Sequence, residues 1–191
     1  MIRTRVLTEG DWQLWRELRL AALAEAAYAF GSRLADWQGD GDREERWRGR
    51  LAIPGSYNIL AMRDGQPVGM VSGVPTDRDG VVELISMYVS PVGRGRGVGD
   101  HLVRAVERWA RQVGAGTLRL AVTEGNENAW ALYRRNGFRD TGEPGDLMPD
   151  NVRREHVMAK SLGNDGQPAR VRTRRRRPAP NSRKEWPSRA E

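Results

Sequence analysis

A glycine-spaced segment between a strand pattern and a long helix pattern limits the folds open to this chain. Val81 to Val89 is rich in apolar and β-branched residues, as expected of a strand. From Val98 to Val113, apolar residues recur at helical spacing along one face. The residues that join them, Arg94 to Gly99, read Arg-Gly-Arg-Gly-Val-Gly. A strand that turns directly into an amphipathic helix predicts an α/β fold.

The glycines of Arg94 to Gly99 predict a phosphate-binding loop. Glycine lets the backbone approach a ligand closely, and the first amides of a helix have no hydrogen-bond partner within it. Such a nest of N–H groups suits a pyrophosphate, and Arg94 and Arg96 would add positive charge, although one of them could simply be solvated. A tight turn that binds nothing is the alternative. The Walker A pattern is absent, and a Rossmann fingerprint would open the first βαβ unit of the chain.

Patterns elsewhere predict the other elements of one domain. Strands are expected at 2–7, 57–62, 68–74, 118–122, from 138 onward and at 153–162. Helices are expected after the capping pattern at 8–11, at 42–51 and at 126–136, with a loop between the first two helices. Gly137 suits the end of the 126–136 helix because glycine tolerates left-handed backbone angles. The predicted order is β-α-α-β-β-β-α-β-α-β-β, an α/β domain around a mixed sheet.

Positive charge is concentrated at one end of the chain. Residues 1–162 hold 23 Lys and Arg against 22 Asp and Glu, whereas residues 163–191 hold nine against three. A nearly neutral folded part is not built around a nucleic-acid backbone. The second segment, with its run Arg174 to Arg177, is rich in Gly, Pro, Asn and Ser and predicts a disordered basic tail. Weak association of this tail with RNA, acidic lipid or an acidic protein stays open.

Composition excludes several kinds of chemistry. The chain has no cysteine and two histidines, His101 and His156, which argues against thiolate catalysis and against a metal site. No apolar run is long enough for a membrane span, and the N-terminus lacks the apolar core of a signal peptide. These features predict a cytoplasmic protein with no membrane partner. The two histidines are interpreted as structural or surface residues, with a substrate contact by His156 as the alternative.

A second motif makes a family resemblance specific. Arg94, Gly97 and Gly99 fit the Q/R-x-x-G-x-G/A motif of the GNAT superfamily of N-acetyltransferases. The segment from Asn126 to Phe138 resembles that superfamily's second signature, N-x-x-A-x-x-L-Y-x-x-x-G-F. The chain thus resembles the superfamily over residues 1–162. The resemblance implies a single domain with a mixed, mostly antiparallel central sheet flanked by helices.

The same resemblance implies acetyl-CoA as cosubstrate and no metal. Backbone groups of Met87, Tyr88 and Val89 would pair with the pantetheine arm like an added strand. Asn126 would bind the cofactor near its pantetheine, and Tyr133 would lie beside its sulfur. The amides that would hold the pyrophosphate are those of Arg94, Gly95, Arg96, Gly97, Val98 and Gly99.

Acetyl transfer to an amine requires a base for the ammonium and a proton for the departing thiolate. Glu83 is the candidate base. Its side chain is expected on the same strand face as the apolar Ile85 and Met87, an unusual place for a carboxylate unless it lines a cleft. Its spacing of eleven residues before Arg94 resembles that of the catalytic glutamate in the superfamily's histone acetyltransferases. A solvated edge position or a pair with an arginine is the alternative. Ala121 stands where the ribosomal-protein alanine acetyltransferases carry a glutamate, which argues against their type of base.

Tyr133 is the candidate acid, because a phenol can pass a proton to a thiolate at close range. Its alternative role is that of a core aromatic. A backbone amide on the strand Val81 to Val89 would suffice to stabilise the oxyanion.

The resemblance implies an acceptor pocket between the first two helices and the loop of the last two strands. Acidic groups beside aromatics there would suit a cationic amine, although such charges are usually just solvated. The candidates are Asp36, Trp37, Asp40, Asp42, Glu44, Glu45, Trp47, Glu143, Asp146 and Asp150.

Three functions remain open from the sequence. The favoured one is acetyl transfer to a small-molecule amine by direct attack in a ternary complex. The others are the same reaction on a protein lysine or N-terminus, and a degenerate acyl-CoA binder that acts as an interaction protein. The sequence also leaves a homodimer open.

Overall fold

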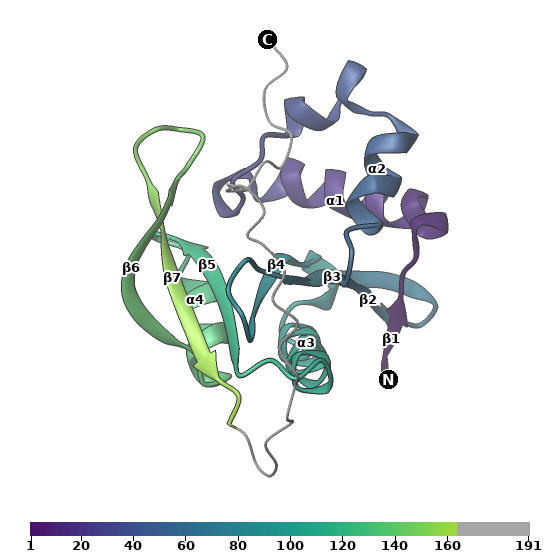
Figure 1. Cartoon of the computed structure of the whole chain (residues 1–191). Helices are drawn as coiled ribbons and strands as arrows, with labels where there is room; N and C mark the ends of the chain where they lie inside the picture. The colour runs from purple at the N-terminus through teal and green to yellow at the C-terminus, as the bar shows by residue number, and fades with distance from the viewer. Residues whose placement is uncertain (164–191) are drawn as a thin grey trace, which may run out of the picture.

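The computed structural model describes residues 1–163 of the chain (Figure 1). The strands are β1 (Ile2–Val6), β2 (Tyr57–Arg63), β3 (Gln66–Pro75), β4 (Val81–Val89), β5 (Thr117–Thr123), β6 (Arg139–Leu147) and β7 (Arg154–Ser161). The helices are α1 (Trp12–Glu25), α2 (Glu44–Leu51), α3 (Val98–Gln112) and α4 (Glu127–Arg135). This order of strands and α-helices is the predicted one. Apart from Gly163, the segment predicted to be a disordered tail lies outside the described residues.

The strands form one sheet in the order β1-β2-β3-β4-β5-β7-β6. Within the described chain β4 and β5 are the one parallel pair, and all other neighbours are antiparallel. Parallel neighbours need a crossover connection, which α3 supplies here. The predicted α/β fold with a mixed, mostly antiparallel sheet is therefore confirmed.

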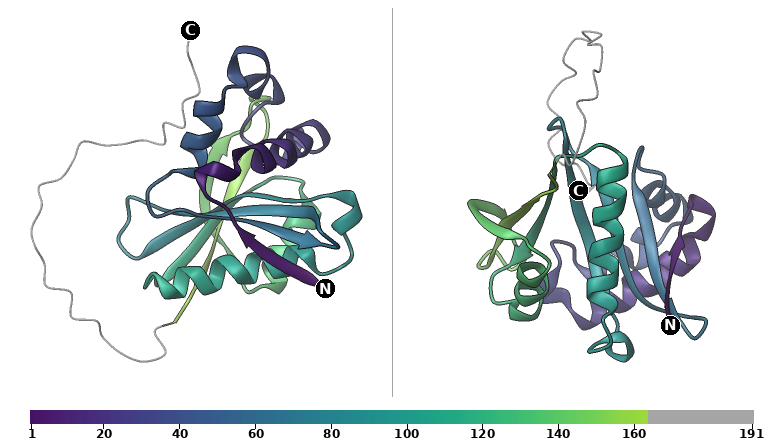
Figure 2. Two further views of the ribbon diagram at one scale, coloured as in Figure 1. Left: turned by 90° about the vertical axis from the view of Figure 1, so that its right-hand side faces the viewer. Right: turned by 90° about the horizontal axis from the view of Figure 1, so that it is seen from below.

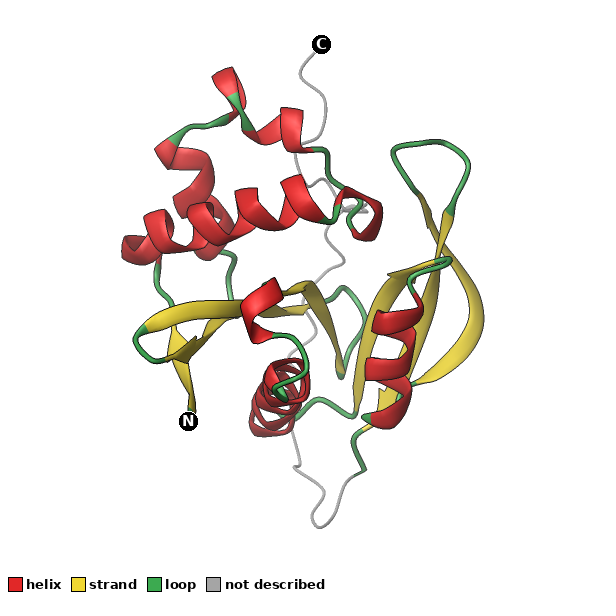
Figure 3. Ribbon diagram, turned by 180° about the vertical axis from the view of Figure 1, so that it is seen from behind, coloured by secondary structure: helices red, strands yellow, loops and turns green. Residues whose placement is uncertain are grey.

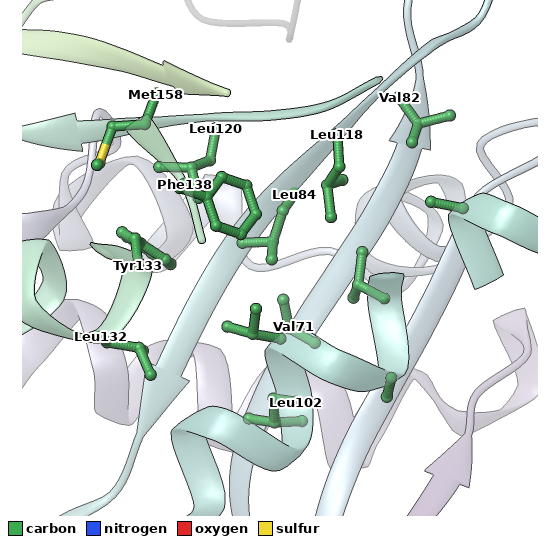
Figure 4. Close-up of a cluster of buried hydrophobic side chains, with 14 of the residues drawn as sticks. Val71, Val82, Leu84, Leu102, Leu118, Leu120, Leu132, Tyr133, Phe138 and Met158 are labelled. Atoms are coloured by element: carbon green, nitrogen blue, oxygen red, sulfur yellow. The ribbon is translucent and has the colours of Figure 1, made fainter. Parts of the chain in front are cut away.

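Helices cover both faces of this sheet (Figure 2). α1 and α2 lie over one face, and α3 and α4 lie over the other. Successive residues of a strand point to opposite faces, so Met70 of β3 packs with α1 and α2 whereas Val71 packs with α3. Figure 4 shows the cluster of buried side chains that contains Val71. In it, Leu102 of α3 and Tyr133 of α4 lie on the same side of the sheet as Val71. The sheet is the middle of three layers.

The segment between α1 and α2 differs from the loop predicted there. Three 3-10 helices occupy it: Ala27–Ala29, Leu34–Trp37 and Gly39–Gly41. Trp37 is buried, with its ring centroid 4.5 Å from that of Trp47 in α2. One buried tryptophan thus packs this polar stretch onto the core, which a count of polar residues does not reveal.

No helix within residues 1–163 is both long enough and apolar enough to cross a membrane.

Candidate active site

The parallel strands β4 and β5 separate halfway along β4 (Figure 3). Their paired residues begin at Val81 and Thr117 and end at Leu84 and Leu120. Among the described residues, Ile85 to Val89 have no partner on β5. A cleft of about 1920 Å³ lies here and is lined by both strands. Because backbone N–H and C=O groups need partners, the open edge of β4 can pair with an extended ligand.

A β-bulge shapes β4 where it borders the cleft. The register of β3 against β4 shifts there, so that Ser86 and Met87 together lie opposite Val71. Ser86 has a φ of 55°, a conformation that residues other than glycine rarely adopt. Its hydroxyl oxygen accepts a hydrogen bond from Nη2 of Arg50 at 3.2 Å. Strained residues of this kind persist where their surroundings hold them, and they cluster at functional sites.

The glycine loop lies at the cleft and leads into α3. Gly95 and Gly97 have φ values of 69° and 77°, and a Cβ at either position would meet nothing within 4 Å. Backbone conformation therefore requires glycine at both positions, and the space beside them is open. The first bond of the helix runs from the amide of His101 to the carbonyl of Gly97 at 3.0 Å, which leaves the preceding amides of α3 without a partner in the helix.

The residues of the loop do not all face the cleft. Arg94, Gly95, Gly97 and Gly99 line it. Arg96 is exposed and is not among the residues that line the cleft. The side chain of Val98, the first residue of α3, is buried in the core. Its backbone amide is therefore the group that is available to a ligand.

Arg94 ties the loop to the end of α1. Its Nη2 lies 2.6 Å from Oε1 of Glu25, and its Nε donates a hydrogen bond to the carbonyl of Val89 at 3.1 Å. The hydroxyl of Tyr88 donates to Oε2 of Glu25 at 2.5 Å. These two partners, Tyr88 first and Arg94 second, lower the pKa of Glu25, while burial and the neighbouring carboxylate raise the pKa of Tyr88 to about 12. This network fixes the position of the loop relative to β4.

Asp100 in the first turn of α3 also lines the cleft. Its carboxylate accepts two hydrogen bonds from Arg135 at 2.9 and 2.8 Å and one from Nδ2 of Asn136 at 2.8 Å. The hydrogen bonds from Arg135 are the main reason that the pKa of Asp100 falls to about 2. Because Arg135 balances this negative charge, an anionic ligand at the helix N-terminus does not face a lone carboxylate.

Glu83 lines the cleft from β4 and is only 6% exposed. Its burial excludes the alternative of a solvated edge position. Arg119 lies opposite Glu83 in the register of β4 and β5 and also lines the cleft, so an arginine neighbour is part of the site. Ala121 follows on β5 and lines the cleft without a carboxylate. The role of Glu83 as base stays a prediction.

Tyr133 of α4 lies between the core and the cleft. Its ring packs edge to face on Phe138 at a centroid distance of 5.9 Å, and both rings are drawn in Figure 4. Tyr133 also lines the cleft. Burial raises the pKa of its phenol above the ordinary value of 10.0, which keeps the hydroxyl protonated at neutral pH. Tyr133 therefore packs in the core and also reaches the cleft, and its role as acid stays a prediction.

The residues expected along the pantetheine also lie at the cleft. Met87, Tyr88, Val89 and Asn126 all line it. Oδ1 of Asn126 accepts a hydrogen bond from the amide of Ala129 at 3.3 Å and so caps α4. The cap gives Asn126 a structural role in addition to the predicted contact with the cofactor.

The acidic acceptor wall does not form as predicted. Of the ten acceptor candidates, Trp37 and Asp146 line the cleft. Asp42 instead binds Arg16 through Nε at 2.6 Å and accepts a hydrogen bond from the indole of Trp47 at 2.8 Å. Trp47 itself is fully buried. Asp42 and Trp47 stabilise the packing of α1 on α2, so these two residues are not available to an amine.

Arginines on α1 and α2 occupy that side of the cleft instead, and the sequence reasoning missed them. Arg19 is buried in α1 with Trp15, Leu18, Ala22 and Leu23 at helical spacing. Arg50 is buried in α2 with Trp47 and Leu51 in the same way. Both arginines line the cleft. An arginine in the apolar stripe of a helix was the signal that could have identified them.

The histidines lie outside the lining of the cleft. Nε2 of His101 is 2.8 Å from the hydroxyl of Thr4, and His156 packs edge to face on Trp130 at 5.5 Å. Their contacts agree with the interpretation as structural residues. Over residues 1–163, no group of three or more His, Cys, Asp or Glu side chains is arranged to hold a metal ion.

Residues 16–138 match the model of the Acetyltransferase (GNAT) family. A curated relative, the IAA acetyltransferase of Azospirillum brasilense, is 34% identical over 100 residues, and the match covers 52% of this chain and 65% of that protein. The match therefore spans less than two thirds of that relative's length. The aminoglycoside N(6')-acetyltransferase type 1 of Stenotrophomonas maltophilia is 30% identical over 146 residues, with 72% of this chain and 86% of that protein covered.

Solved structures show the same fold. The structure of yncA from Salmonella typhimurium, which contains its cofactor acetyl-CoA, superposes with a TM-score of 0.68 at 20% identity. The superposition covers 90% of this chain and 99% of that one.

Proposed function

We propose that this chain, which belongs to the Acetyltransferase (GNAT) family, transfers an acetyl group from acetyl-CoA to a primary amine of a small molecule. The amine nitrogen attacks the thioester carbonyl directly, the amide bond forms and the carbon–sulfur bond breaks. The separation of β4 from β5, with a glycine nest near one end and a buried carboxylate near the other, carries this proposal.

The cofactor site follows from the backbone. The unpaired amides at the start of α3 suit the pyrophosphate of acetyl-CoA. The open edge of β4 from Met87 to Val89 suits the pantetheine arm, whose amides can hydrogen-bond like an added strand. Asn126 and Tyr133 face the same cleft from α4. A bound thioester would then lie where the two strands part.

The proton transfers are assigned to Glu83 and Tyr133. An alkyl ammonium has a pKa of about 10.4, so at neutral pH it must lose a proton before it can attack. Glu83 accepts this proton, directly or through water. The thiolate of CoA takes the phenolic proton of Tyr133 as it leaves, and the proton that the attacking nitrogen loses as the amide forms restores the phenol. A backbone amide of β4 near the bulge stabilises the oxyanion.

A small-molecule acceptor is favoured by the relatives. One matching protein is named for the acetylation of aminoglycosides, and the Azospirillum relative is named for IAA. The walls that α1, α2 and the β6–β7 hairpin give the cleft also suit a small acceptor.

The proposal is tested by the release of CoA thiol from acetyl-CoA with a panel of small amines. Mass spectrometry of the products identifies an N-acetyl amine. Reactions without an added amine are the control for hydrolysis that does not depend on the acceptor. Acetylation of protein substrates but of no small amine would contradict the proposed acceptor, and binding of acetyl-CoA without any transfer would contradict the proposed reaction.

A further inference from the structure

A buried guanidinium faces the acceptor side of the cleft. Arg19 of α1 is only 7% exposed and lines the cleft. Its Nη1 has no hydrogen-bond partner among the residues that the structure describes. The guanidinium carbon lies 4.5 Å from the centroid of the Phe30 ring, which supports one face of the group. Burial lowers the pKa of Arg19 to about 10, so the group is still charged at neutral pH.

The charges buried around Arg19 do not balance. The buried charged residues of the described chain are Arg19, Arg50 and Glu83, two cations against one anion. A buried charge is costly unless a counter-charge and hydrogen bonds compensate it. The one fully buried carboxylate is outnumbered by two fully buried arginines, and Nη1 of Arg19 has no acceptor among the described residues.

The neighbouring arginines are already engaged. Arg50 donates hydrogen bonds to Asn58, Ser72 and Ser86 at 3.0 to 3.2 Å. Its pKa falls to about 9, mainly through burial and further through the charge of Arg19. Arg46 donates to backbone carbonyls of Asp36 and Gly41. Among the cleft-lining arginines of α1 and α2, Arg19 is therefore the one with a buried N–H that no described residue satisfies, while the buried Nε of Arg119 on β5 also lacks a partner within residues 1–163.

We propose that the acceptor amine carries a carboxylate close to its amino group, as an α-amino acid does, and that Arg19 binds this carboxylate. The inference rests on the proposed acetyl transfer and names the class of its acceptor. A guanidinium presents its N–H groups as a planar fork that matches a carboxylate. The acceptor anion would satisfy Nη1 of Arg19 and balance the buried charge, while the amine faces the cleft that Glu83 lines.

The kinetic test compares L-α-amino acids with their amides as acceptors for the full chain. The amide keeps the size and the amine but removes the negative charge. The amine of an amino acid amide is less basic than that of the amino acid, so more of it is neutral at a given pH. A preference for the acid must therefore come from binding. We expect the wild-type protein to prefer the acids in kcat/KM. Analogues with a phosphinate in place of the carboxylate separate recognition of the carboxylate from recognition of any oxyanion.

Arg19→Gln should remove this preference. We expect a rise in KM for the amino acids of about 10- to 100-fold, the effect of one lost hydrogen bond to a charged group, with little change for the amides. Arg16→Gln is the matched control, because it removes a positive charge from the same helix at a position outside the cleft. Equal use of acids and amides by the wild-type protein, or an unchanged KM in Arg19→Gln, would overturn the inference and leave the proposed acetyl transfer intact.

A stability measurement tests the inference without turnover. Arg19→Met keeps the bulk and removes the charge, so without ligand its melting temperature should rise by about 2 to 4 °C. A lower melting temperature would show that the protein compensates the charge itself and would overturn the inference. If no amine at all were acetylated, the proposed function would fail separately. The inference would then be tested by the melting temperature of the CoA-bound protein. Amino acids should raise it for the wild type and not for Arg19→Gln, and the absence of this difference would overturn the inference.

Discussion

Glu83 and Arg119 lie opposite each other across the parallel pair of β4 and β5, one residue before that pair ends at Leu84 and Leu120. Both side chains line the cleft, and that of Glu83 is buried. A carboxylate is thus held at the point where the strands part, beside the place where an acyl group would lie between them.

Glu83→Gln should lower kcat on the order of 10² to 10⁴ fold, because the variant keeps the shape of the side chain but cannot accept the proton of the ammonium. The deficit should be largest at neutral pH and should shrink as the pH rises, since more of the amine is then already neutral. The measurement is a pH series of initial rates with a competent acceptor.

Glu17→Gln on the exposed side of α1 is the matched control for loss of one carboxylate and should keep its activity. A Glu83→Gln protein that is as active as this control at every pH would remove Glu83 from the mechanism.

Tyr133→Phe should bind acetyl-CoA normally and turn over more slowly, because it keeps the ring that packs on Phe138 and removes only the proton donor. We expect the loss at every pH at which the phenol is neutral. Phe138→Leu disturbs the same ring contact from outside the cleft and should lower the melting temperature while activity per folded molecule persists. Near-normal turnover with lowered stability in Tyr133→Phe would instead make Tyr133 a core residue alone.

Local patterns were sufficient to predict the loop and its helix. The glycines of Arg94 to Gly99 and the apolar stripe of α3 are short-range signals, and the family resemblance was confirmed by the match over residues 16–138. The separation of β4 from β5 was not predicted, because it depends on the register of strands that a whole helix separates in sequence. The pairing of Arg94 with Glu25 is likewise a contact between distant parts of the chain.

Of the acids expected around the acceptor, Asp146 alone lines the cleft. The acids between 36 and 45 were considered because the first two helices were expected to border the acceptor, yet Asp42 forms an ion pair with Arg16. Arg19 was overlooked because the helix was assigned from its apolar residues alone. Its position three and four residues from the buried Ala22 and Trp15 shows that a charged residue can share the buried face of a helix.

Gly97→Glu should abolish the stabilisation of the protein by acetyl-CoA. The new side chain would place bulk and negative charge in the open space at the N-terminus of α3, where the pyrophosphate is expected. The measurement is the melting temperature with and without acetyl-CoA.

Gly114→Glu is the control for backbone strain in that experiment. Gly114 follows the other end of α3 with the same φ of 77°, and a Cβ there would also meet nothing within 4 Å. Both variants should lose similar stability without ligand, and only Gly114→Glu should still respond to acetyl-CoA. A normal response in Gly97→Glu would refute the phosphate loop.

Asp100→Asn should destabilise the protein at neutral pH and less so in acid. The folded-state pKa of Asp100 is about 2, below its ordinary value of 3.8, because Arg135 and Asn136 hydrogen-bond to the carboxylate. A lowered pKa means that the carboxylate stabilises the fold above about pH 4 and that this contribution is lost as the pH falls toward 2. Since the ion pair is partly exposed and screened, its contribution at pH 7 should be about 1 kcal/mol, or about 2 to 4 °C in melting temperature.

The melting temperatures of wild type and Asp100→Asn, measured from pH 7 to pH 2, should therefore converge as the acid limit is approached. Asp79→Asn changes an exposed acid in a turn and should leave the whole curve in place. A difference between wild type and Asp100→Asn that stays constant down to pH 2 would show that the substitution acts through packing. In that case Arg135 would not stabilise the Asp100 carboxylate in the way that their two hydrogen bonds indicate.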